Sequence, residues 1–288
     1  MEKQLQIILQ KRCVDFLTST PVRSCPKSLL KSALMEERHA EIVHVKAKGK
    51  ITHQERSNEG IRIQYSVHVQ YLIKQDEFFY IEEEIEHRHA LYCNDELLED
   101  EEISYMKETE ESIKEFDADT FMRAPFYYDR FKAVQYAERW WNEYNPAYQE
   151  FGNNCTNFIS QCLHAGGGPM RGAPNRSKGW WYSGKSWSYS WSVAHALYLY
   201  LKNSTIGLRA KEVSKPEELM LGDIICYDFE GDGRFNHNTI VTAKDIHGMP
   251  LVNANTTDSR LRYWSYEDST AYTPNIQYRF FHIVDDHS

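Results

Sequence analysis

The apolar residues at the beginning of the chain recur at the spacing of an amphipathic helix. Within residues 1–19 they are Leu5, Ile8, Leu9, Val14 and Leu17. Thr20-Pro21 ends this pattern, because proline lacks a backbone donor and clashes with the preceding turn. A second short helix is predicted from Pro26 to about Glu37, since proline is favoured in the first turn of a helix.

The pattern then changes to the alternation that is typical of half-buried strands. Residues 42–47 and 61–71 alternate apolar and polar side chains, with a turn at Asn58-Glu59-Gly60, and residues 78–89 predict a third strand. Helices followed by long antiparallel strands indicate an α+β domain of the cystatin-like or NTF2-like kind, which we place at residues 1–112. It carries no catalytic constellation, so we expect it to bind a ligand or to regulate.

An acidic stretch follows these strands. Residues 96–111 contain Glu99-Asp100-Glu101-Glu102 and Glu108-Thr109-Glu110-Glu111. Runs of this kind are usually solvated, so we interpret the stretch as a connector. The predicted linker covers residues 113–126, and the second domain covers residues 127–288.

A helix predicted in the second domain places a cysteine in its first turn. Its apolar face consists of Phe158, Ile159, Cys162 and Leu163, and a glycine run from Gly166 ends it. Asn153 and Asn154 are favourable cap residues, which puts Cys155 at the helix start. There the unpaired N–H groups and the positive end of the helix dipole favour a thiolate.

A base and an orienting group follow on predicted strands. Gly222-Asp223-Ile224 begins one strand, and His237 lies at the beginning of the next. Residues 251–258 predict a third strand, on which Asn253 and Asn255 share a face. The chain order cysteine, histidine, asparagine is the order found in papain-like enzymes.

The residues from about Tyr127 onward resemble the putative amidase domain family of Gram-positive bacteria, a branch of the papain-like and NlpC/P60-like cysteine hydrolases. The matching pieces are Tyr128-Asp129-Arg130, Ala133-Val134, Tyr136-Ala137, Asn145-Pro146 with Tyr148, Cys155-Thr156-Asn157-Phe158, Ser160-Gln161, Gly222-Asp223-Ile224, His237 with Ile240-Val241-Thr242, and Thr256-Thr257-Asp258. The chain departs from the family at two positions. Asn154 replaces the usual Asp before the cysteine, and Asn255 replaces the usual His before the threonine-rich turn.

The resemblance implies an α+β fold in which a helix-borne cysteine packs on a small antiparallel sheet. It also implies a bacterial amidase that acts on peptidoglycan, on its fragments or on another peptide or amide substrate. In this interpretation Cys155 attacks the amide carbonyl, His237 transfers the proton and Asn255 orients the imidazole. We prefer Asn255 over Asn253 because the family histidine maps there. No metal or organic cofactor is required for this chemistry.

An aromatic and serine-rich segment, residues 179–191, lies between two predicted helices. Trp181, Trp187 and Trp191 are candidate substrate-binding residues, because flat apolar rings separated by small polar side chains suit a sugar or a peptide. The alternative is that these rings cover the core, and the sequence favours neither.

Composition limits the compartment and the partners. The net charge of −9 argues against a nucleic-acid partner, which requires a basic surface. The sequence predicts neither a signal peptide nor a transmembrane segment, and the six cysteines show no paired spacing. We therefore expect a cytoplasmic protein with free thiols, while a non-standard export route stays open.

Two other functions use the same residues. A catalytically weak or inactive papain-like binding module would keep the aromatic segment, and the asparagines at 154 and 255 are its best support. A cysteine transferase or deamidase that acts on intracellular proteins would share Cys155 and His237. Labelling of the thiol separates the first from an enzyme, and the product of the reaction separates the second from a hydrolase.

Overall fold

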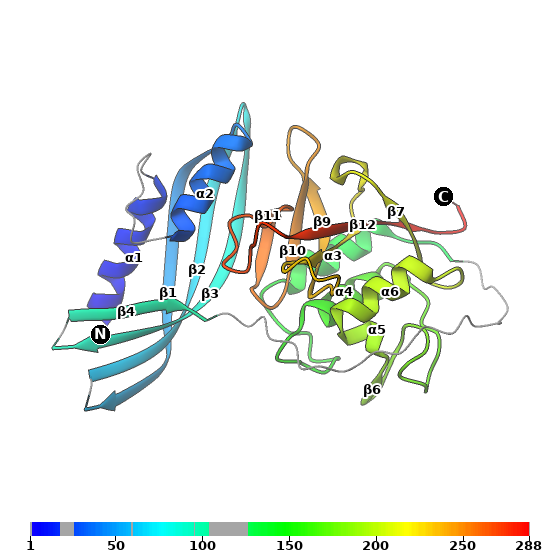
Figure 1. Cartoon of the computed structure of the whole chain (residues 1–288), viewed down its shortest axis with the longest axis horizontal. Coiled ribbons are helices and arrows are strands. Elements are labelled where there is room, and N and C mark those ends of the chain that lie inside the picture. Colours follow the sequence, from blue (N-terminus) through cyan, green and yellow to red (C-terminus); the bar gives the residue numbers. More distant parts are fainter. Residues whose placement is uncertain (1, 18–25, 59, 95, 104–125, 288) are drawn as a thin grey trace. The chain divides into compact units, whose positions relative to one another are not determined.

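The alternating segments of the first half form three long antiparallel strands in the computed structural model (Figure 1). They are β1 (Glu41–Ser57), β2 (Gly60–Gln75) and β3 (Phe78–Cys93). Ser57 pairs with Gly60 and Gln75 pairs with Phe78, so each neighbouring pair is closed by a short turn. The three predicted strands are confirmed, and each is longer than the alternation alone indicated.

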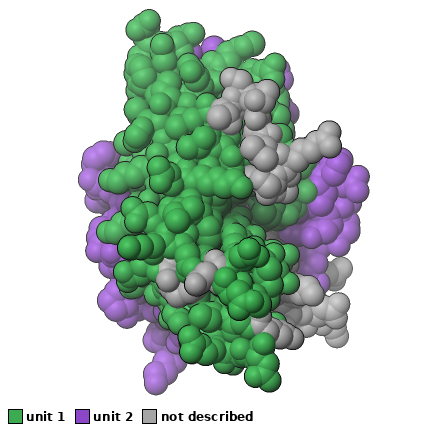
Figure 2. Space-filling view, turned by 90° about the vertical axis from the view of Figure 1, so that its left-hand side faces the viewer, with its two compact units in different colours: residues 1–104, 257–272 green, residues 105–256, 273–288 purple. Residues whose placement is uncertain are grey.

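The structure describes residues 2–17, 26–58, 60–94, 96–103 and 126–287. The chain divides into two compact units, which Figure 2 colours separately. The first unit contains residues 1–104 and 257–272, and the second contains residues 105–256 and 273–288. Both combine helices with antiparallel strands, which confirms a mixed α+β chain.

The two predicted N-terminal helices are confirmed. α1 spans Glu2–Leu17 and α2 spans Pro26–Glu37. Val14 and Leu17, which we assigned to the apolar face of α1, are exposed. Arg12 is buried instead, because it pairs with a carboxylate of β3. The buried residues of α1 are Leu5, Leu9, Arg12, Asp15 and Phe16.

The buried face of β3 is charged rather than apolar. Glu82, Glu84 and Glu86 are buried, whereas Ile81 is 42% exposed and Ile85 is half-buried. Side chains two apart on a strand share a face. If the apolar face of this strand were buried, Ile81 and Ile85 would lie inside. The carboxylates point inward because α1 and α2 supply cations to that face.

A network of buried ion pairs lies in the interior of the first unit. Its cations are Arg12, Lys27, Lys31, Arg88 and Arg262, and its carboxylates are Glu82, Glu84, Glu86, Asp100, Glu102 and Asp268. The carboxylate of Glu86, for example, accepts from Arg12 at 2.6 Å and from Lys27 at 2.9 Å. Because each charge is desolvated, removing one partner leaves a costly uncompensated group.

Part of the acidic stretch is a strand. β4 (Glu96–Glu102) pairs antiparallel with the end of β3, and Asp100 Oδ1 accepts from Tyr65 Oη at 2.7 Å and from Arg88 Nε at 2.9 Å. The interpretation as a connector is therefore wrong for these residues, because they form a strand in which Asp100 and Glu102 pair with the buried cations Arg88 and Lys27, while the other acidic side chains of β4 are exposed. The remainder of the stretch from residue 104, and nearly all of the predicted linker at 113–126, lie outside the described residues.

A segment from late in the chain completes the first unit. Residues 257–272, which we predicted to lie in the second domain, belong to the first unit. β11 (Ser259–Tyr263) pairs with β3, and Lys31 Nζ on α2 lies 2.7 Å from Asp268 Oδ2. The segment thus contributes both a strand and a buried carboxylate to the N-terminal unit.

The second unit contains the cysteine helix and further antiparallel strands. Its helices are α3 (Arg130–Trp140), α4 (Cys155–Ala165), α5 (Tyr189–Ser192), α6 (Ala194–Asn203) and the 3₁₀ turn η1 (Pro216–Glu218). Five of its strands pair in the order β10 (Pro250–Ala254), β9 (His237–Lys244), β8 (Ile224–Asp228), β12 (Gln277–Val284) and β7 (Arg209–Val213). A small hairpin joins β5 (Tyr182–Ser183) to β6 (Ser186–Trp187).

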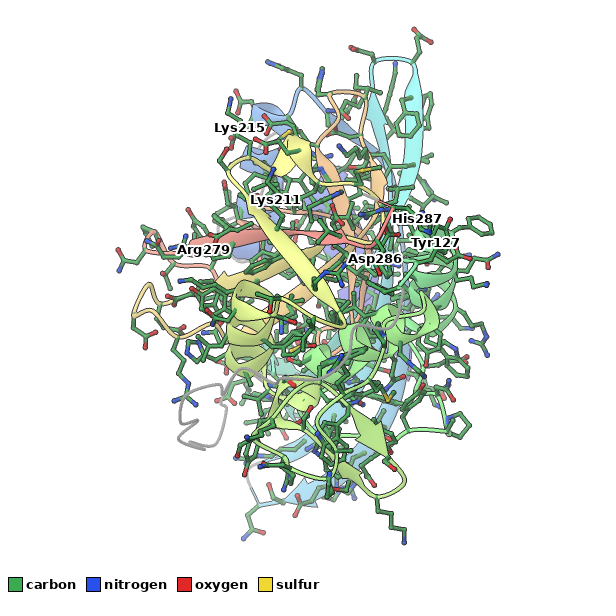
Figure 3. All side chains as sticks on the ribbon, turned by 90° about the vertical axis from the view of Figure 1, so that its right-hand side faces the viewer. Tyr127, Lys211, Lys215, Arg279, Asp286 and His287 are labelled. Atoms are coloured by element: carbon green, nitrogen blue, oxygen red, sulfur yellow. The ribbon has the colours of Figure 1, made fainter. Side chains whose placement is uncertain are left out.

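The beginning and the end of the second unit are tied together. Phe126 N donates to Asp286 Oδ2 at 2.7 Å, and the ring of Tyr127 meets that of His287 edge-on (Figure 3). β12 lies between β8 and β7. The edge is β7, whose Lys211 (Figure 3) disfavours pairing with another chain. Among the described helices, none has both the length and the apolar character needed to span a membrane.

Candidate active site

The predicted cysteine helix is confirmed, and it begins at Cys155. The apolar face of α4 is buried as predicted, with Phe158, Ile159, Cys162 and Leu163 in the core. Side-chain hydrogen bonds hold the helix on both sides. Tyr136 Oη on α3 donates to Gln161 at 2.6 Å, and Asn238 Nδ2 on β9 donates to Thr156 Oγ1 at 2.9 Å.

Asn154 occupies the N-cap position of α4 but makes no side-chain cap hydrogen bond. Its amide joins a buried network of asparagines instead. Asn154 Nδ2 donates to Asn255 Oδ1 at 2.7 Å, and Asn157 Nδ2 donates to Asn154 Oδ1 at 2.8 Å. Trp191 Nε1 then donates to Asn157 Oδ1 at 2.7 Å. The positive end of the helix dipole beside Cys155 is therefore not compensated by the side chain of its own cap residue.

The thiol of Cys155 sits among small polar groups. Its Sγ lies 3.6 Å from Asn153 Oδ1 and 3.7 Å from Thr156 Oγ1, and the residue is 1% exposed. Two further thiols lie in the core of the unit. Burial raises the pKa of Cys162 well above its usual value, and burial together with the nearby Cys155 does the same for Cys226. Both of these thiols therefore stay protonated at neutral pH.

His237 begins β9, as predicted, and is buried. Its strand partner is Tyr227 on β8, and the two ring centroids are 5.6 Å apart. The acidic turn that leads to it is held by Asp228, whose carboxylate accepts from the backbone N–H groups of Gly231 and Gly233. Asn238, the next residue, holds Thr156 beside the cysteine, so β9 and the start of α4 meet at this point.

Comparison with known proteins adds an independent finding. A protein-family model described as "Putative amidase domain" matches residues 127–281, which is more than half of the chain. The chain belongs to this family. The resemblance stated from the sequence is thereby confirmed, and amide hydrolysis is the activity that the family description indicates.

Two proteins of Bacillus subtilis (strain 168) are similar to this chain. "Uncharacterized protein YhbB" is 57% identical over 266 residues, which is 89% of this chain and 85% of the relative. "Uncharacterized protein YjcM" is 31% identical over 126 residues, which is 41% of this chain and 28% of that relative. No solved structure matches the chain.

The two positions that depart from the amidase family pattern contact each other. Asn255 follows β10, and its side-chain hydrogen bonds go to Asn154 and to the Trp141 carbonyl, the latter at 3.2 Å. Asn253, the alternative orienting residue, donates to Glu138 Oε1 at 2.8 Å and accepts from Thr242. The roles assigned to Cys155, His237 and Asn255 in the amidase domain therefore remain predictions.

The structure separates the three candidate substrate-binding tryptophans. Trp181 and Trp191 are 2% and 0% exposed, so neither offers a face to a ligand in this structure. The indole N–H of Trp181 donates to the carbonyls of Asn175 and Lys178, and that of Trp191 donates to Asn157 Oδ1. Trp187 is half-buried, and its ring packs against Phe151 with a centroid distance of 4.8 Å. Aromatic residues spaced by serine carry no signal that distinguishes these two situations.

Four polar residues that shape the cysteine turn were not predicted as site residues, although three of them belong to the motifs that carry the family resemblance. They are Thr156, Asn157, Asn238 and Thr256. Asn157 and Asn238 follow Cys155 and His237 closely in the sequence, so the sequence indicates that they lie near the site. It does not indicate which residues they form hydrogen bonds with. Among the described residues, no three His, Cys, Asp or Glu side chains gather in a way that would hold a metal ion.

Replacing Trp191 by phenylalanine is expected to disturb the cysteine turn. The change removes the donor to Asn157 Oδ1, which leaves a buried acceptor unpaired and costs about 1–3 kcal/mol of folding free energy. Trp180→Phe is the matched control, because Trp180 is also fully buried and donates to Ser160 in the same helix at 2.9 Å. Urea unfolding should show a loss in both variants. Iodoacetamide labelling of Cys155 should change in Trp191→Phe alone, and an equal change in both would contradict this role.

Proposed function

We propose that this member of the amidase family is a cysteine-dependent amidohydrolase. The observation that carries the proposal is the position of Cys155 at the start of α4, beside an N-cap whose side chain is engaged elsewhere. A helix N-terminus lowers the pKa of a cysteine and exposes backbone N–H groups to an anion. Cys162 and Cys226 lack this position and are held as thiols by burial.

The proposed reaction is acyl transfer to the thiol. The Cys155 thiolate adds to the amide carbonyl carbon, and the backbone N–H of Cys155 stabilises the oxyanion. The carbon–nitrogen bond then breaks as His237, which holds the thiol proton, transfers it to the leaving amine. Water, deprotonated by His237, finally adds to the thioester, which releases the acid and returns Cys155. The papain-like arrangement of these groups is part of the proposal.

The proposed substrate is an amide bond in peptidoglycan or one of its fragments. Half-buried aromatic rings beside the cysteine turn support this substrate class. Phe151 lies four residues before Cys155, and its backbone N–H donates to Asn154 Oδ1 at 3.4 Å. Its ring meets Trp187, which in turn stacks with Tyr182 at a centroid distance of 6.0 Å. Such rings offer flat faces to a sugar and polar tips to a peptide.

The proposal is tested by the reactivity of the thiol, which requires no substrate. Iodoacetamide labelling of each cysteine is followed by peptide mass spectrometry as a function of pH, in the parent and in His237→Ala. Cys155 should react well below the ordinary thiol pKa of about 8.5 and should lose this advantage without His237. His195→Ala, on α6, is the control and should leave the profile unchanged. If Cys155 labels no faster than the unfolded-state thiols, the domain is a binding module.

A further inference from the structure

The turn after β10 holds the residue that precedes the cysteine at two points. Asn154 Nδ2 donates to Asn255 Oδ1 at 2.7 Å, and Asn154 N donates to Thr256 Oγ1 at 2.5 Å. Both the side chain and the backbone of Asn154 are thus fixed by consecutive residues from a remote part of the chain. The position of Cys155 relative to the sheet depends on this turn.

The same turn has an unusual backbone conformation. Thr256 and Thr257 have φ angles of 68° and 67°, in the left-handed region that β-branched residues rarely adopt. Residues in such conformations persist only where the surrounding structure holds them, and they occur often at functional sites. The described contacts of Thr256 with Asn154 are one restraint, and the chain that continues from Thr257 supplies the other.

That continuation is the segment 257–272, which belongs to the first unit. The carbonyl of Asp258 accepts from Ile85 N at 2.8 Å, and Arg260 Nη1 lies 2.9 Å from Glu83 Oε1. Asp268 is fully buried and binds Lys31 at 2.7 Å and Arg262 at 2.8 Å. The first unit therefore fixes the segment at its beginning by strand pairing and near its end by buried charge.

We propose that the N-terminal unit regulates the cysteine site by restraining the turn at Asn255 and Thr256, which act as positioning residues for Asn154 and Cys155. The inference rests on the proposed function for its consequence in catalysis. The restraint passes along the covalent chain, from Asp268 through β11 to Thr257 and Thr256. A ligand or modification that loosens the segment 257–272 would lower the activity without touching Cys155.

The test compares two aspartates of the same buried network. Asp268→Asn removes a charge within the segment, whereas Asp100→Asn removes a charge on β4, which pairs with Arg88 outside the segment. Hydrogen exchange of the Asn154 amide is the readout, because it reports the turn whether or not Cys155 is a nucleophile. Asp268→Asn should accelerate this exchange by about tenfold or more, and Asp100→Asn should not.

Two outcomes would overturn the proposal. One is unchanged exchange at Asn154 in Asp268→Asn while residues 258–268 exchange faster, and the other is equal acceleration by both aspartate variants. If Asp268→Asn does not fold, Arg260→Gln replaces it, since Glu83 keeps its hydrogen bonds to His68 and Gln70. Thr256→Val should also accelerate the exchange, and Thr256→Ser should restore it, because serine keeps the acceptor. If Cys155 shows no enhanced labelling that depends on His237, the proposed function is contradicted. The result of the hydrogen-exchange test would remain valid in that case.

Discussion

Replacement of Cys155 by alanine is expected to abolish amide hydrolysis while the protein stays folded. Removing the nucleophile should lower the rate by about 10³-fold or more, because the remaining groups cannot form the acyl-enzyme. The change deletes one buried sulfur atom, and the described contacts of that atom are long ones to Asn153 and Thr156. Release of amino groups from a peptidoglycan digest measures the activity, and urea unfolding checks the fold.

Cys162→Ala is the matched control for this prediction. Cys162 lies two turns further along α4 and is as deeply buried, and this burial raises the pKa of its thiol. We expect it to lose some stability through the small cavity and to keep most of its activity. Full activity in Cys155→Ala, or a comparable loss in Cys162→Ala, would contradict the nucleophile assignment.

Replacement of Glu86 by glutamine is expected to destabilise the first unit by about 3–5 kcal/mol, because three cations lose a shared buried partner. Burial alone would raise the pKa of Glu86, but the charges of Lys27, Arg12 and Arg88 lower it well below its usual value of 4.5. The ionised group therefore contributes stability above that value, and this contribution is lost as the pH falls below it.

The free energy of unfolding should depend on pH in a direction that follows from the lowered pKa of Glu86. Urea unfolding of the parent at about pH 7 and about pH 4 should show a loss on the acid side, and the loss should be smaller in Glu86→Gln. Burial raises the pKa of Glu82, so this group acts in the opposite direction and loses its contribution as the pH rises through its folded-state pKa. Glu101→Gln is the control, since Glu101 pairs with His89 at the surface and should have little effect. A pH dependence that is equally steep in parent and Glu86→Gln would contradict the assignment.

The sequence correctly predicted those elements that are determined by the pattern of their own residues. The start of α4 follows from two asparagines and a regular apolar face, and the structure begins this helix at Cys155. The long strands follow from alternation in the same way. The position of His237 at the mouth of β9 follows from the turn residues that precede it.

The sequence did not predict those features that depend on a partner residue far away in the chain. The inward carboxylates of β3 depend on Lys27 and Lys31, and the acidic strand β4 depends on Arg88, so neither arrangement is visible in its own segment. The burial of Trp191 depends on Asn157, 34 positions earlier. The mutual contact of Asn154 and Asn255 likewise joins residues 101 positions apart, although both had been noted separately.

The composition of the first unit from two separate stretches has a consequence for biosynthesis. Asp268 lies 237 positions after its partner Lys31. At translation rates of about 5–20 residues per second, the ribosome needs roughly 10–50 s to deliver that carboxylate. In the meantime Lys31 lacks this counter-charge and β3 lacks the strand β11. The N-terminal unit, although translated first, is therefore expected to be completed only after the helix of Cys155 and strands β8–β10 have been synthesised.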